Sequence, residues 1–174
     1  MNFSLTHSIA ILDRTPDVLA ALLQDLPSEW TLANEGANTW SAFDIVGHLI
    51  EGEKWDWIAR MDIILSGRED KTFQPFDRFA QFEGSKGKSL SELLEEFKVL
   101  RIKNLQYLRS KELTSDHLKE EGIHPHFGVV SLSQLLATWT VHDLNHIAQI
   151  SRVMAKQYIT AVGPWKAYLK ILQL

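Results

Sequence analysis

The chain has 174 residues, of which 45% are hydrophobic and 23% charged, with a formal net charge of -4 and no cysteine. This length and hydrophobic share predict a single domain over residues 1–174, and the mildly acidic balance argues against a nucleic-acid partner. The lack of cysteine excludes disulfides, thiol nucleophiles and zinc-finger sites. The N-terminus lacks the pattern of a secretory signal and no apolar stretch is long enough to span a bilayer, so we expect a cytoplasmic protein without a membrane partner.

Helical periodicity first appears in two segments of the N-terminal part of the chain. The first helix is predicted over Ser4–Asp25 with a kink at Thr15-Pro16, because proline suits the first turn of a new helical piece. The second is predicted over Ser41–Gly67, with Trp55 on its inward face. Its start, Ser41 followed by Asp44, has the spacing of a capping box.

Two further helices are predicted in the C-terminal part. They cover Ser89–Arg109 and Ser131–Tyr158, and both begin with the Ser-x-x-Glu/Gln pattern of a capping box. A short helix over 164–169 is expected to close the chain. Because no segment alternates as a half-buried strand does, the sequence predicts an all-α four-helix bundle.

Two predicted connections, residues 67–88 and 111–130, are long for a bundle, where such links usually have about 2–8 residues. The first contains four phenylalanines, Phe73, Phe76, Phe79 and Phe82. Two interpretations stay open for them. They form either a satellite hydrophobic cluster beneath a long loop or one wall of a pocket.

His142 and His146 are four residues apart, which places both imidazoles on one helical face. Both could reach one metal ion, as the histidines of a zincin helix do, although Asp143 stands where a zincin has glutamate. Their face is shared with apolar side chains, namely Leu135, Trp139, Ile150 and Val153. Buried imidazoles need polar partners, so the alternatives are metal ligation or hydrogen bonds to carbonyl groups in the core.

His48 lies on the inward face of the second predicted helix, seven residues after Ser41. If this helix and the fourth are antiparallel, His48 approaches His142 and His146 at the same end of the bundle. Three imidazoles leave part of the coordination sphere open, as in catalytic sites. They also leave the charge of a divalent ion uncompensated, so that it can acidify water or a thiol, or polarise a carbonyl.

Two carboxylates are candidate catalytic proton carriers near these histidines. Glu51 follows His48 by three residues, and Asp143 is the neighbour of His142. An exposed or capping role fits each of them equally well. Three further side chains are candidates to orient the imidazoles from behind: Asp44, Asn145 and Gln149.

Two segments carry a resemblance to a known family. Residues 39–49 (TWSAFDIVGHL) and 135–150 (LLATWTVHDLNHIAQI) resemble the DinB-like superfamily of four-helix bundles, which includes YfiT-like proteins. Residues 12–16 (LDRTP) and 162–169 (VGPWKAYL) add support. The resemblance extends over nearly the whole chain.

The resemblance implies an up-down-down-up bundle with one divalent metal ion, often nickel or zinc, on His48, His142 and His146. It also implies that a low-molecular-weight thiol is a candidate cosubstrate, since some members are thiol-dependent transferases or isomerases. Dimers are common in the family, so a homodimer is one expectation for this chain.

The leading hypothesis is a metal-dependent enzyme, a thiol-dependent transferase or a hydrolase, acting on a small-molecule substrate. The substrate would lie between the three histidines and residues 67–88. Two alternatives stay open. The protein is either a non-catalytic metal-binding or small-molecule-binding stress-response module, or a structural protein whose histidines are satisfied within the core.

Overall fold

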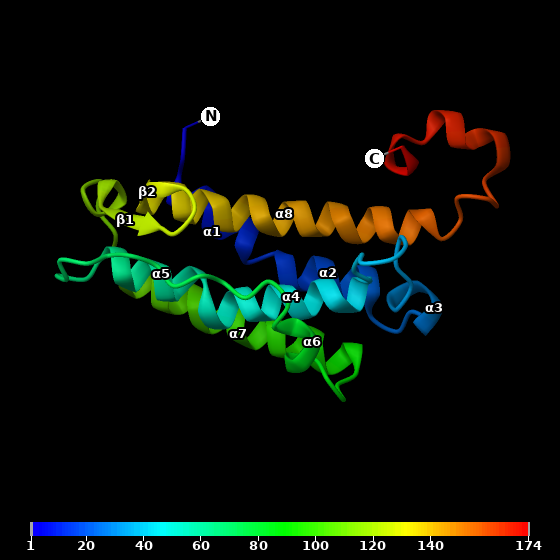
Figure 1. Ribbon diagram of the computed structural model, residues 1–174, viewed down its shortest axis with the longest axis horizontal. Coiled ribbons are helices and arrows are strands. Elements are labelled where there is room, and N and C mark those ends of the chain that lie inside the picture. Colours follow the sequence, from blue (N-terminus) through cyan, green and yellow to red (C-terminus); the bar gives the residue numbers. More distant parts are fainter. Residues whose placement is uncertain (1, 174) are drawn as a thin grey trace.

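The computed structural model describes residues 2–173 and is built mainly from helices, which Figure 1 shows lying side by side. The long ones are α1 (Leu5–Leu12) and α2 (Thr15–Leu23), α4 (Ala42–Trp55) and α5 (Trp57–Ile64), α7 (Leu90–Ser110), and α8 (Leu132–Lys156). Short turns are α3 (Ser28–Thr31), α6 (Gln81–Gly84), η1 (His117–Lys119), η2 (Gly163–Tyr168) and η3 (Lys170–Leu172). The four predicted helices are confirmed, and the predicted C-terminal helix is a 3₁₀ turn.

The helices run up, down, down and up, as the family resemblance implies (Figure 1). The four helices of the bundle are α1 with α2, α4 with α5, α7, and α8. The second of these (α4 with α5) and the third (α7) are parallel, because Lys54 Nζ lies 2.9 Å from Glu96 Oε1 and the Tyr107 hydroxyl donates to Asp62 Oδ1 over 3.1 Å. Residue numbers therefore rise together along both helices. A parallel pair needs a connection that returns the length of the bundle, which explains the long crossover over residues 65–89.

Local sequence signals set the helix starts. All three predicted capping boxes form. In each, the serine hydroxyl accepts from the backbone N–H of the residue three positions on, and the side chain of that residue accepts from the backbone N–H of the serine. They pair Ser41 with Asp44, Ser89 with Glu92, and Ser131 with Gln134. The predicted kink is also present, since α1 ends at Leu12 and α2 places Pro16 in its first turn.

The second helix breaks at Asp56, where the sequence predicts a continuous helix. Asp56 has φ -109° and ψ -76°, which ends α4 and starts α5 with a changed rotation. The predicted inward position of Trp55 is therefore wrong: this side chain is 69% exposed, and Trp57 is buried instead. Beyond the break the buried stripe continues through Met61 and Ile64.

A small antiparallel hairpin, β1 (Glu121–His124) and β2 (Gly128–Ser131), precedes α8 and is absent from the sequence prediction. Its four-residue strands are too short to show alternation. The hairpin holds the crossover in place, because Phe73 N donates to Ile123 O over 2.9 Å and Ile123 N donates to Lys71 O over 3.0 Å.

A layer of polar side chains separates two apolar clusters in the bundle interior. One cluster surrounds Ile45, Phe97 and Ile150, and the other surrounds Met61 and Trp139. The side chains between them are buried and charged or polar: Glu53, Arg101, Asn104, Asp143 and His146. No helix within residues 2–173 combines the length and the apolarity needed to cross a bilayer.

Candidate metal centre

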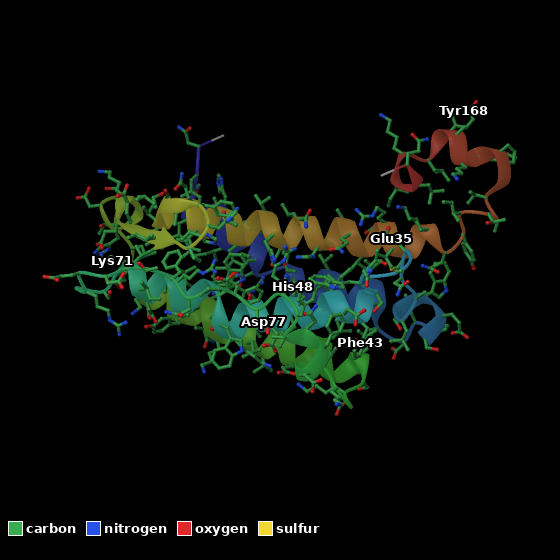
Figure 2. The ribbon with its side chains drawn as sticks, viewed as in Figure 1. Glu35, Phe43, His48, Lys71, Asp77 and Tyr168 are labelled. Carbon is green, nitrogen blue, oxygen red and sulfur yellow. The ribbon has the colours of Figure 1, made fainter. Side chains whose placement is uncertain are left out.

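Three imidazoles from two antiparallel helices converge near the middle of the bundle, where Figure 2 labels His48. His48 lies on α4, and His142 and His146 lie on successive turns of α8. The Nε2 atoms of His48 and His142 are 3.3 Å apart, and those of His142 and His146 are 3.1 Å apart. One ring nitrogen from each residue lies within 4.8 Å of the other two. The structure thus brings together the three histidines singled out in the sequence.

The spacing of these nitrogens fits a tetrahedral metal ion. Metal–nitrogen bonds of about 2.0–2.1 Å at tetrahedral angles require nitrogens roughly 3.3–3.4 Å apart. The two separations involving His142 are close to this value. In the described part of the chain, Nδ1 of His48 and Nδ1 of His142 are buried and have no hydrogen-bond partner. The Nε2 atoms, by contrast, face one another, an arrangement that could hold a shared cation.

Aromatic rings enclose the cluster. Trp40 and Phe76 lie 4.8 and 5.7 Å from the ring of His48, and Trp57 lies 5.1 Å from the ring of His142. Burial is the main cause that lowers the pKa of His48 to about 4 and that of His142 to about 2. Both imidazoles are therefore neutral at physiological pH, which is the form that binds a metal.

His146 is oriented from behind by Gln149, one of the candidates for this role. Nδ1 of His146 lies 2.8 Å from the amide oxygen of Gln149, which accepts a hydrogen bond from Nδ1–H and leaves the lone pair of Nε2 directed at the cluster. Burial lowers the pKa of His146. The other two candidates differ: Asp44 caps α4, and Asn145 lines the adjoining cavity.

The structure does not bring Glu51 to the histidines. Its carboxylate accepts from Trp55 Nε1 over 3.1 Å and from Lys54 Nζ over 3.2 Å. It also lies against α6, since a methyl group on Gly84 would meet Glu51 Oε1 at 2.7 Å. Glu51 faces the α6 side of α4, because three residues along a helix rotate a side chain by about 60°. This position does not favour a catalytic role for Glu51, which stays a prediction.

Asp143 likewise points away from the cluster and into the polar layer. Arg101 Nη1 donates to its Oδ2 over 2.6 Å, and Arg101 Nη2 donates to its Oδ1 over 3.0 Å. Adjacent helical residues differ in direction by about 100°, so Asp143 enters the core while His142 faces the cavity. Asp143 is held in this ion pair, a position that does not favour its catalytic role, which stays a prediction.

A cavity of about 990 Å³ adjoins the three imidazoles. It lies between α4, α5 and α8, under the crossover segment and the turn of the hairpin. Six aromatic side chains line it: Trp40, Trp57, Phe73, Phe76, Phe79 and Phe127. Of the two interpretations of the crossover, the pocket wall is observed for Phe76 and Phe79, whereas Phe73 both lines the cavity and packs in the apolar cluster around Met61. Phe82 instead stacks on Phe79, with ring centroids 6.3 Å apart.

The model of the DinB superfamily matches residues 11–150, which is most of the chain and includes all three histidines. The chain belongs to the DinB superfamily. Its structure is similar to that of YfiT from Bacillus subtilis, a protein described as a probable metal-dependent hydrolase with an unusual four-helix bundle topology. The TM-score is 0.74 with 21% sequence identity, covering 88% of this chain and 87% of that one, so the two share a fold. No protein with a curated description matches the chain.

Behind the histidines, this DinB superfamily member has a buried ionic network that the sequence analysis missed. Arg101 Nη2 donates to Glu53 Oε1 over 2.8 Å, and Trp139 Nε1 donates to the same oxygen over 3.0 Å. Burial raises the pKa of Glu53, with Arg101 opposing it. For Arg101 itself the charges of Glu53 and Asp143 outweigh burial and raise the pKa. The network joins α4, α7 and α8 beside the histidines.

Proposed function

We propose that the protein is a metal-dependent hydrolase of small molecules whose divalent ion is held by His48, His142 and His146. One observation carries the proposal. Three neutral imidazoles converge at metal-binding distances where they face a cavity large enough for a small molecule, since ligand pockets commonly have about 300–1,000 Å³. The description of YfiT as a probable metal-dependent hydrolase supports the same class of activity.

Each part of the site has a distinct task in such a reaction. A divalent ion on three neutral ligands supplies Lewis acidity, which polarises a carbonyl or acidifies a water molecule. Trp40, Trp57 and Phe76 exclude bulk water from the imidazoles, and Gln149 keeps the His146 lone pair aimed at the centre. Polar side chains of α8 beside the histidines are available to orient the substrate: Gln134, Thr138 and Asn145.

The test is the metal content of the purified, untagged protein by mass spectrometry, after incubation with zinc or nickel. We expect near-stoichiometric metal in the wild type and its loss in His142→Ala. The matched control is His124→Ala, which removes an imidazole that lines the cavity outside the cluster and should leave the metal content unchanged. A wild type that binds neither metal, or a His142→Ala variant that retains it, would refute the site.

Hydrolysis is then assayed with 4-nitrophenyl butyrate before and after chelation. Activity that is lost on chelation and restored by metal supports the hydrolase, whereas metal binding without turnover supports a binding module. The cavity, at about 990 Å³, also has room for a thiol beside a substrate, which makes a thiol-dependent transferase the second candidate. Turnover of an electrophile only when a low-molecular-weight thiol is added would favour the transferase.

A further inference from the structure

The charges on the cavity wall do not balance. Within residues 2–173, three arginines and two acids line it: Arg60, Arg78, Arg152, Glu35 and Asp56. Arg152 donates to both carboxylate oxygens of Glu35, over 2.7 and 2.9 Å. Arg60 Nε lies 2.6 Å from Asp56 Oδ1. Both acids are therefore already neutralised by an arginine of the same wall, and Arg78 remains.

Arg78 has no carboxylate partner within residues 2–173, and its side chain is exposed. The adjacent Asp77 forms no ion pair with Arg78; its Oδ1 accepts from Phe79 N over 2.9 Å in a local turn. Arg78 stands between Phe76 and Phe79, which both line the cavity.

We propose that the cavity binds an aromatic carboxylate, with the carboxylate on Arg78 and the ring against the aromatic wall. The carboxylate would be the substrate class of the proposed hydrolase. Only its hydrolysis rests on that proposed function, because binding to Arg78 needs no metal. A guanidinium binds a carboxylate through two parallel hydrogen bonds. The lining supplies one unpaired arginine and, within residues 2–173, no lysine, which suits a singly charged carboxylate better than a phosphate dianion.

The net charge of the cavity wall is opposite in sign to that of the whole protein. The chain has a formal net charge of -4, yet its cavity wall carries one excess positive charge. A divalent ion on three neutral histidines would add to that excess. An anionic substrate would thus be attracted to the cavity and held between the aromatic wall and Arg78.

Binding is measured on the purified protein by quenching of tryptophan fluorescence, since Trp40 and Trp57 line the cavity. The probes are 3-phenylpropionate and its uncharged isostere 3-phenylpropionamide. Arg78→Gln should weaken binding of the carboxylate about fivefold to tenfold and leave binding of the amide unchanged. Arg78→Lys, which keeps the charge, should recover part of the loss.

The matched control is Arg68→Gln, which makes the same charge change at an exposed arginine outside the cavity and should alter neither affinity. Equal affinity for both probes, no binding of either, or an equal loss in the Arg68 variant would overturn the proposal. Tighter binding of phenyl phosphate than of the carboxylate would overturn the carboxylate assignment.

The same probes separate this proposal from the metal site. His142→Ala should lose metal but still prefer the carboxylate, while Arg78→Gln should keep its metal. A carboxylate preference that disappears in His142→Ala would assign the anion to the metal and refute the role of Arg78. If the wild type binds no metal but Arg78 still selects the carboxylate, the hydrolase fails and the anion site stands.

Discussion

Replacing Arg101 by methionine should destabilise the protein by about 4 kcal/mol at neutral pH, since losing one partner of a buried ion pair costs about 3–5 kcal/mol. The guanidinium is 1% exposed, and the side chains of Glu53 and Asp143 are fully buried. Four hydrogen bonds are lost, to Leu12 O, to Glu53 Oε1 and to both oxygens of Asp143. Methionine fills most of the volume of the arginine stem, so the loss is mainly electrostatic.

The destabilisation should depend on pH in a defined direction. Burial already raises the pKa of Glu53 in the folded protein, and removing Arg101 raises it further. A carboxyl whose pKa is higher in the folded than in the unfolded state destabilises the fold when ionised, and this penalty disappears as pH falls below the unfolded value of about 4.3. The difference in the free energy of unfolding between wild type and Arg101→Met should therefore be larger at pH 7.5 than at pH 5.

Urea unfolding followed by circular dichroism at the two pH values measures both effects. A loss of about 4 kcal/mol also corresponds to a fall in Tm of roughly 8–16 °C for a chain of this size. The control is Arg109→Met on the same helix, whose exposed ion pair with Asp13 should be worth less than about 1 kcal/mol. A loss for Arg101→Met no greater than for Arg109→Met, or one that is equal at both pH values, would refute the reasoning.

Two further stability predictions follow from close packing and from burial of an acid. Gly122→Ala should lower the free energy of unfolding, measured in urea, by about 1–3 kcal/mol, because its new methyl group would lie 2.6 Å from the ring of Phe73. The control is Gly67→Ala, whose methyl group would meet no atom within 4 Å and should not destabilise the protein. Burial raises the pKa of Asp56 to about 6 against the attraction of Arg60, so its contribution to stability should fall as pH rises from 4 to 7. Asp56→Asn removes this decline, so between pH 4 and 7 its free energy of unfolding should rise by up to about 3 kcal/mol relative to that of the wild type. Unfolding at each pH measures this difference, and parallel curves of stability against pH would contradict the prediction.

Helix positions were predictable because the information is local. Each long helix repeats its apolar residues over several turns, and the serine capping boxes mark three of the starts within four residues. The convergence of His48, His142 and His146 followed from periodicity once the second and fourth helices were taken as antiparallel. Periodicity fixes the face of a helix, and antiparallel packing then fixes which faces meet.

The parts that the sequence did not predict depend on contacts between distant residues. The break at Asp56 changes the helix rotation by an amount that no local pattern encodes, so Trp55, predicted to face inward, is exposed and Trp57 is buried. Glu53 and Arg101 were not recognised as interior residues, because a charged side chain on a helix is usually solvated unless a partner is buried with it. Each partner lies on another helix, 48 residues away.

The ionic layer and the metal centre are related through the rotation of α8. Asp143 and His142 are adjacent, so the direction that lets Asp143 meet Arg101 also directs His142 towards α4. Apolar side chains would tolerate several rotations of this helix, since leucine and isoleucine pack without fixed directions. The two Nη atoms of Arg101 reach two carboxylates and a backbone carbonyl at once, although its Nε has no partner in the described part of the chain, and fixed bond directions of this kind allow few rotations of the helix. We therefore interpret the buried charges as the feature that selects the rotation in which the imidazoles converge, at a desolvation cost that an apolar layer would avoid.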